Sequence, residues 1–267
     1  MDVFYRSEGL AGVEHIGPVA ESVIHSETGS RRSHPQVTKS TSTVVTWHSG
    51  LAVDWSRLGA FEDDKRPASL ALKRLIDIVG SFVALVALAP LLMIVAIIIK
   101  ISSRGPVFFR QAREGLNGEH FSVLKFRSMH VELCDATGVA HTVDDDPRIT
   151  WIGRIIRKTS IDELPQLFNV LAGDMSLVGP RPHVPGMLAA GQSYRQLVSD
   201  YDERLRMRPG ITGWAQANGL RGSASNARKA RERIYHDIAY VQNFSLWLDV
   251  KIMVKTVARE FLSGTGS

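Results

Sequence analysis

The sequence lacks the cysteines of a disulfide-bonded protein and those of a cysteine-rich metalloprotein. Only one of its 267 residues is cysteine, Cys134, so an intramolecular disulfide is excluded and one thiol cannot form a zinc cluster by itself. The first 50 residues contain no long apolar run, so we expect no cleavable secretion signal. No internal repeat is visible. The single cysteine fits a protein of a reducing compartment.

Residues 1–66 also lack sustained helical or strand periodicity and are rich in Ser, Thr, His, Gly and charge. We predict a disordered or poorly ordered polar tail with one short strand at Thr43–Trp47, followed by a single domain at 67–267. The net charge of +5 and the pI of about 9.5 indicate an anionic partner, which composition alone leaves open between nucleic acid, phosphate-bearing molecules and a membrane surface.

A run from Gly80 to Ile99 carries no charge and has the length of about 20 residues that crosses a bilayer core. A buried helix of a soluble protein seldom stays apolar on every face for so long. Pro90 lies near the middle and predicts a kink, and lysines and arginines flank both ends, so the usual bias of positive charge to one side is nearly missing. A re-entrant helix over about 70–103 that bends and returns to the same face explains both features. A simple spanning helix remains the alternative.

The next segment predicts a β-hairpin, because two runs rich in Val and Phe flank the turn signal Asn117–Gly118. In the second run Val123, Lys125 and Arg127 share one face by the period of two, which places two cations side by side. The alternative is a solvated edge strand whose charges prevent aggregation.

The rest of the domain reads as helical, so the expected fold class is α+β and mostly helical. We expect helices at Ile149–Ile156, Leu164–Leu171, Tyr194–Met207 and Leu246–Leu262. The last of these carries an apolar stripe formed by Leu246, Val250, Met253, Val257 and Phe261. The stripe either faces the core or lies on a membrane surface with Trp247 at the headgroup level.

Two adjacent acids, Asp162 and Glu163, begin a helical pattern in the segment RKTSIDELPQLFNVLAGDMSLVGPRP. Pro165 fits only the first turn of a helix, so the acids belong at its N-terminus, where partial positive charge favours anions. Ser160 and Glu163 match a capping box. Taken alone, the pair therefore fits a helix cap as well as it fits a catalytic site.

Basic residues around the acids change that balance. Arg157 precedes the pair, Arg181 follows between two prolines that restrict its backbone, and Arg208 precedes a Pro-Gly pair. Guanidinium groups match the geometry of phosphate oxygens. Acids with several arginines beside a membrane element suit a site for a divalent metal and phosphates, in which one carboxylate holds magnesium and the other attacks phosphorus.

Four ordered segments resemble the bacterial sugar transferases that start glycan assembly on undecaprenyl phosphate, the monotopic polyprenyl-phosphate phosphoglycosyl transferases. They cover roughly residues 70 to 258 and read KRLIDIVGSFVALVALAPLLMIVAIIIKISSRGPVFFRQAREGLNGEHFSVLKFRSM, DPRITWIGRIIRKTSIDELPQLFNVLAGDMSLVGPRP, RPGITGWAQANGLRG and YVQNFSLWLDVKIMVKT.

The resemblance implies roles for individual residues. Asp162 corresponds to the nucleophile that forms a covalent sugar-phosphate, and Glu163 to the ligand of Mg²⁺. The positions that match phosphate-binding groups of the family are Lys125, Arg127, Arg157, Arg181 and Arg208. The family's re-entrant helix breaks at a Ser-Pro pair, which is Ala89–Pro90 here, so the proline is kept and the serine hydroxyl is missing.

The resemblance also implies partners and a location. The expected donor is a UDP-sugar carrying glucose or galactose, and the expected acceptor is undecaprenyl phosphate. The enzyme would lie in the bacterial inner membrane with its catalytic domain and amphipathic interfacial helices on the cytoplasmic face, and would begin exopolysaccharide repeat-unit assembly. Later glycosyltransferases and a second copy of the chain are further candidate partners. The alternative functions are a non-catalytic membrane scaffold and a tethered nucleic-acid-binding protein, and the second is disfavoured because no nucleic-acid-binding motif occurs.

Overall fold

The computed structural model describes residues 44–46, 52–54, 67–133, 146–220, 222 and 226–263, all within one compact unit, Ser40–Ser267. Most of the predicted polar tail therefore lies outside the described residues. Within it, β1 (Val44–Thr46) confirms the strand expected at Thr43–Trp47 and pairs with β2 (Ala52–Asp54) in antiparallel fashion. Val53 is fully buried in the main core, and the Asp54 N–H donates to Gln242 at 3.0 Å. The folded unit thus includes a part of the chain N-terminal to residue 67.

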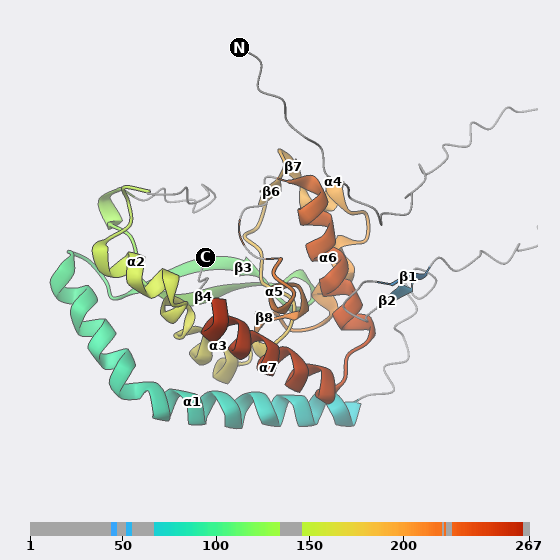
Figure 1. Ribbon diagram of the computed structural model, residues 1–267, viewed down its shortest axis with the longest axis horizontal. Helices are drawn as coiled ribbons and strands as arrows, with labels where there is room; N and C mark the ends of the chain where they lie inside the picture. The colour runs from blue at the N-terminus through green and yellow to red at the C-terminus, as the bar shows by residue number, and fades with distance from the viewer. Residues whose placement is uncertain are drawn as a thin grey trace, which may run out of the picture. The chain divides into compact units, whose positions relative to one another are not determined.

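The described residues form helices with four small two-stranded sheets, which agrees with the expected α+β class (Figure 1). The helices are α1 (Pro67–Ser102), α2 (Trp151–Lys158), α3 (Gln166–Ala172), α4 (Tyr194–Leu197), α5 (Trp214–Ala217), α6 (Ala227–Gln242) and α7 (Leu246–Ser263). The remaining strands are β3 (Phe108–Glu114), β4 (His120–Phe126), β5 (Ser176–Val178), β6 (Leu188–Ala189), β7 (Gln192–Ser193) and β8 (Gly210–Thr212). Short 3₁₀ turns occur at η2 (Leu116–Gly118), η3 (Val131–Leu133), η4 (Ile161–Glu163) and η5 (Tyr201–Arg206).

Helix α1 is the one described helix long and apolar enough to cross a membrane, and only 11% of its most apolar 18-residue stretch is buried. The core helix of a soluble protein is mostly buried, and this stretch is not. Its exposed side chains include Phe82, Val86, Met93 and Ile94. The helix contains Pro90, and Figure 1 shows its axis changing direction part way along its length.

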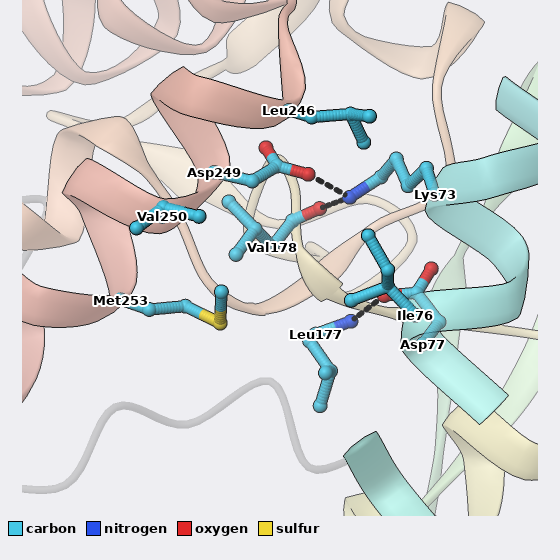
Figure 2. A pocket seen from close by; sticks show the side chains of 9 residues that line it. All are labelled: Lys73, Ile76, Asp77, Leu177, Val178, Leu246, Asp249, Val250 and Met253. Carbon is cyan, nitrogen blue, oxygen red and sulfur yellow. Dashed lines mark hydrogen bonds and ion pairs between the residues drawn. The ribbon is translucent and has the colours of Figure 1, made fainter. Parts of the chain in front are cut away.

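The N-terminal half of α1 is fastened to the folded unit by polar contacts. Figure 2 shows Lys73 reaching Asp249 of α7 at 2.6 Å and the carbonyl of Val178 at 2.9 Å. Asp77 accepts from the N–H of Leu177 at 2.9 Å in the same place. Burial of an ion pair is tolerated when its remaining donors and acceptors are satisfied, as these are. The contacts fix this half of the apolar helix against β5 and α7.

The C-terminal half of α1 packs against a different part of the same unit. Val95 and Ile99 are buried in a cluster with Phe126 of β4 and with Ile152 and Ile156 of α2. Both halves therefore contact the folded unit, while the apolar surface between them is exposed.

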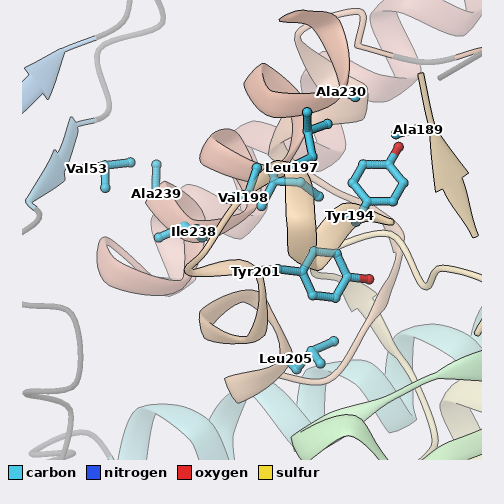
Figure 3. Close-up of a cluster of buried hydrophobic side chains, with 11 residues drawn as sticks. Val53, Ala189, Tyr194, Leu197, Val198, Tyr201, Leu205, Ala230, Ile238 and Ala239 are labelled. Atoms are coloured by element: carbon cyan, nitrogen blue, oxygen red, sulfur yellow. The ribbon is translucent and has the colours of Figure 1, made fainter. Parts of the chain in front are cut away.

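The main core, in which Val53 is buried, forms where α6 meets η5, α4 and β2. Figure 3 shows Tyr194 and Tyr201 at one side of this cluster, with their hydroxyls directed away from Val198 and Ile238. Burying a tyrosine ring is favourable when its hydroxyl finds a partner. The Tyr201 hydroxyl donates to Glu114 Oε2 at 2.6 Å.

Three helix predictions need correction. The first helix begins at Trp151 instead of Ile149, because the Thr150 hydroxyl accepts from the Gly153 N–H and caps it there. The single helix expected at Tyr194–Met207 is wrong, because the chain leaves helical geometry at Val198 and divides into α4 and η5. Helix α7 forms as expected, and Leu246 and Met253 of the predicted stripe pack partly buried against the core, whereas Val250 is exposed. The buried positions Leu248, Asp249 and Ile252 were not included in the predicted stripe. The exposed apolar side chains of α7 include Trp247, Val254 and Val257.

Candidate active site

The β-hairpin of β3 and β4 carries the first cation of the site. The turn lies where predicted, with Asn117 at φ 54° and Gly118 at φ 81°, both in the left-handed region that Asn and Gly tolerate best. The register pairs Phe109 with Lys125, and Val123 is buried on the same strand. The strand thereby directs Lys125 toward the acid pair, and its ammonium donates to Glu163 Oε1 at 2.7 Å.

The acid pair lies in η4, just before α3, and the predicted capping box is wrong. Ser160 adopts a left-handed backbone (φ 55°), and its side chain caps nothing. Pro165 is the residue that precedes the first helical position, Gln166. The carboxylates of Asp162 and Glu163 are therefore not used to cap α3, and they interact with basic side chains instead.

Glu163 is held between two cations. Besides Lys125, Arg181 donates to it through both terminal nitrogens, at 2.7 Å to Oε1 and 3.3 Å to Oε2. The side chains of Glu163 and Lys125 are 17% and 18% exposed, so water screens these pairs weakly. Burial acts to raise the pKa of Glu163, but Arg181 and Lys125 outweigh it and hold the pKa well below the usual range. Glu163 is therefore ionised at any physiological pH.

Asp162 is affected in the opposite direction. Burial raises its pKa from 3.8 to about 6, an effect opposed by Lys125, Arg157 and Arg181 and reinforced by the charge of Glu163. A carboxylate that loses hydration on burial is less stable as an anion than one in water. A nucleophile or proton acceptor needs such a carboxylate, whose pKa lies near the working pH. Two neighbouring acids with pKa values moved apart are expected to have different roles.

The structure brings together some of the predicted site residues and separates others. Lys125, Arg157 and Arg181 all act on the acid pair. Arg208 instead donates to the carbonyl of Gly173 at 2.9 Å, at the end of α3.

Arg127 binds the C-terminal end of α1 and does not contact the acid pair in the hydrogen bonds of the described residues. Its guanidinium is buried and donates to the carbonyls of Ile99, Ser103 and Arg104, which satisfies the C-terminal end of α1. The expectation that it lies beside Lys125 in the phosphate site is therefore not met. Arg127 follows the last residue of β4, where the alternation of strand faces no longer holds.

Arg113 on β3 is a further basic residue of the site that was not predicted from the sequence. It donates to the carbonyl of Pro182 at 3.1 Å and to Gln111 Oε1 at 2.5 Å. Burial lowers its pKa to about 10, with a further lowering by Arg181 and an opposing effect of Glu163. The period of two places Gln111 and Arg113 on one strand face, which was the available signal.

An acid pair surrounded by cations, with a long exposed apolar helix in the same folded unit, suits an enzyme that acts on phosphate groups at a membrane. The sequence model of the family called bacterial sugar transferase matches residues 68–263, and the chain belongs to this family. It is accordingly a transferase. The match covers every described residue of the acid and cation cluster.

The chain is similar to several curated proteins. It is 54% identical over 197 residues to the exopolysaccharide production protein PSS of Rhizobium leguminosarum bv. phaseoli, which covers 74% of this chain and 98% of that protein. It is 50% identical over 202 residues to the undecaprenyl-phosphate glucose phosphotransferase of Komagataeibacter xylinus, covering 74% of this chain and 38% of the relative.

A relative named for another sugar also matches. The UDP-N-acetylgalactosamine-undecaprenyl-phosphate N-acetylgalactosaminephosphotransferase of Aeromonas hydrophila is 43% identical over 201 residues, which are 75% of this chain and 46% of that protein. The chain thus spans less than half the length of the last two relatives and nearly the whole length of the Rhizobium protein.

Proposed function

We propose that this protein transfers a hexose-1-phosphate from a UDP-sugar to undecaprenyl phosphate, the first step of exopolysaccharide repeat-unit assembly. The relatives' names support this donor and this acceptor. The observation that carries the proposal is the acid pair itself, in which Glu163 is ionised between Lys125 and Arg181 while burial raises the pKa of Asp162. A structural cap would need neither the cations nor the difference between the two acids.

The chemistry follows from these roles in two steps. An oxygen of the Asp162 carboxylate attacks the sugar-bearing phosphorus, a bond to Asp162 forms, the bond to the other phosphate breaks, and uridine monophosphate leaves with that electron pair. An oxygen of the lipid phosphate then attacks the same phosphorus and releases Asp162 as a carboxylate. Arg181, Lys125 and Arg157 stabilise the negative charge that collects on the phosphate oxygens in both steps.

The donor set fits a magnesium ion, which we propose as the cofactor. Among the residues that the structure describes, no group of three or more His, Cys, Asp or Glu could hold a metal, so an all-protein cage is not formed there. Magnesium is commonly held by one or two carboxylates together with substrate phosphates, and Glu163 with Asp162 can supply these. Bound there, the ion would neutralise phosphate charge. Since Lys125 and Arg181 already donate to Glu163, they are the side chains that would turn toward phosphate oxygens.

The membrane geometry that we propose is re-entrant, with α1 entering the inner membrane and leaving on the cytoplasmic face. Two observations support it. Lys73 and Asp77 near one end and Val95 and Ile99 near the other contact the same folded unit, and Pro90 lies between them. The exposed apolar side chains of α7, including Trp247 and Val254, fit a helix lying on the same membrane surface.

Cysteine labelling tests this geometry. In a Cys134→Ser background, Ala68→Cys and Ile101→Cys are both expected to react with a membrane-impermeant thiol reagent added to the cytoplasmic side, because both ends emerge there. Met93→Cys, which is exposed on the apolar stretch, is the matched control and is expected to resist the reagent until detergent is added. Labelling of the two ends from opposite sides would establish a spanning helix and exclude the re-entrant one.

The proposed activity predicts a simple requirement for the lipid. Purified protein with magnesium and a UDP-hexose is expected to release uridine monophosphate continuously only when undecaprenyl phosphate is present, and about one equivalent per enzyme without it. A panel of UDP-glucose, UDP-galactose and UDP-N-acetylgalactosamine identifies the sugar. A scaffold, the second candidate, would release none with any donor.

A further inference from the structure

The segment that carries Arg181, residues 180–183, is hydrogen-bonded to neighbouring elements through every one of its carbonyls. Pro180 and Pro182 have no N–H, so the backbone of these two residues can be hydrogen-bonded only through their carbonyls. Each of the four successive carbonyls of 180–183 accepts a hydrogen bond from another element. The donors are the N–H of Gly210 to Pro180 at 2.9 Å, Arg204 to Arg181, Arg113 to Pro182 at 3.1 Å, and the N–H of Glu114 to His183 at 2.9 Å.

The donor to Arg181 is the most deeply buried of these groups. The side chains of Arg204 and Asp237 are each 1% exposed, and Arg204 donates to Asp237 Oδ2 through Nε at 3.0 Å and Nη2 at 2.8 Å. The same Nη2 donates to the main-chain carbonyl of Arg181, and Nη1 donates to the Tyr201 hydroxyl at 3.4 Å. One planar guanidinium thus connects α6, η5 and the loop of the active site.

Such a pair is poorly explained by stability alone. Taking an arginine and an aspartate out of water costs several kcal/mol each, and well-packed apolar side chains of similar volume are often as stabilising or more so. The pair does offer what apolar side chains cannot, which is a fixed donor for one backbone carbonyl. That carbonyl belongs to the residue whose guanidinium holds Glu163.

We propose that the buried Arg204–Asp237 pair is a positioning device for Arg181. It touches neither acid of the site, and it fixes the backbone from which the Arg181 side chain extends to Glu163. Asp237 holds the plane of the Arg204 guanidinium, and Tyr201, itself hydrogen-bonded to Glu114, supports its other edge. The proposal rests on the proposed function, in which Arg181 and Glu163 bind the donor's phosphates.

A double-mutant cycle on nucleotide binding tests this role apart from stability. Arg204→Met together with Asp237→Leu replaces the pair by apolar side chains, so the protein is expected to remain folded by circular dichroism. Because a misplacement of about 1 Å can cost about 10²-fold in a catalytic step, we expect UDP affinity and kcat to fall by about 10- to 100-fold. In an Arg181→Ala background, the same pair of substitutions is expected to cause almost no further loss of UDP affinity.

A neighbouring ion pair of η5 is the matched control. Arg206 donates to Glu203 at 3.3 Å, and the four groups that donate to the carbonyls of 180–183 belong to other residues. Arg206→Met with Glu203→Leu is expected to leave UDP affinity and kcat unchanged.

The outcomes separate the two proposals. Additive losses in the cycle, with the Arg204 and Asp237 substitutions as damaging without Arg181 as with it, would overturn the positioning role, as would unchanged affinity in the folded double variant. Failure of the unsubstituted protein to bind UDP or to release uridine monophosphate would overturn the proposed function instead. If the double variant does not fold, Arg204→Lys provides the second test, because lysine keeps the charge beside Asp237 but cannot also reach the Arg181 carbonyl with a rigid fork. A folded Arg204→Lys variant with normal UDP affinity would likewise overturn the positioning role.

Discussion

Replacing Asp162 with asparagine is expected to abolish turnover, lowering kcat by about 10⁴-fold or more, because an amide cannot form the acyl phosphate that the two-step reaction requires. The measurement is the release of uridine monophosphate with magnesium, donor and lipid acceptor. UDP is expected still to bind, since Arg181, Lys125 and Glu163 keep their contacts. Glu203→Gln, a change of similar size at a carboxylate that pairs with Arg206, serves as the control and should retain activity.

The same substitution is expected to stabilise the protein. The pKa of Asp162 in the folded state, about 6, lies above its ordinary value of 3.8, so the folded state binds the proton more tightly than the unfolded state. The free energy of unfolding therefore falls as pH rises from about 4 to about 6, and the ionised side chain costs about 3 kcal/mol above that range. Asp162→Asn removes this cost. Its melting temperature in metal-free buffer should exceed that of the unsubstituted protein at neutral pH, and the difference should vanish near pH 4.

Glu163→Gln is expected to have the reverse effect on stability. In the unsubstituted protein the pKa of Glu163 lies well below the ordinary value of 4.5, so the charge of Glu163 stabilises the fold above pH 4.5. This stabilisation is lost as the pH falls through the lowered pKa. The glutamine variant removes the charged carboxylate to which Lys125 and Arg181 both donate. Removing one partner of such a buried pair costs about 3 kcal/mol. At neutral pH the melting temperature of Glu163→Gln is therefore expected to lie below that of the unsubstituted protein, whereas that of Asp162→Asn is expected to lie above it.

Activity is also expected to fall in the Glu163→Gln variant, by about 10²- to 10³-fold, because the cations that should face phosphate lose their fixed orientation. Initial rates against magnesium concentration are the measurement, and the apparent requirement for magnesium should rise. Glu203→Gln is again the matched control, since its side chain is 19% exposed against 17% for Glu163 and it also accepts from an arginine. If the two substitutions at Asp162 and Glu163 shifted stability in the same direction, the assignment of different roles to the acids would fail.

Much of the site was predictable because its signals are local. The Asn117–Gly118 turn and the alternation along the second strand were enough to place Lys125, and Pro165 was enough to place the acids before a helix. The long charge-free run identified α1, since about twenty consecutive apolar residues are the length of a membrane-crossing helix and are uncommon in a helix of a soluble protein.

Other features depend on contacts far apart in the chain. Arg127 looked like a neighbour of Lys125, but it donates to the end of α1, about two dozen residues earlier. The capping box of Ser160 and Glu163 matched in sequence and failed because Arg181 and Lys125 compete for the Glu163 carboxylate. Arg204 and Asp237 gave no signal at all, since a buried pair 33 residues apart has no sequence period.

In the proposed reaction, Asp162 carries the sugar phosphate between donor and acceptor. This role is tested most directly by incubating the protein with magnesium and its UDP-sugar without lipid, quenching in acid, and measuring the mass of the peptide that contains Asp162. We expect a gain of one hexose phosphate on that peptide, which is lost when undecaprenyl phosphate is added before the quench and is absent in Asp162→Asn. An unmodified peptide from a preparation that transfers sugar phosphate to lipid at its full rate would contradict this role.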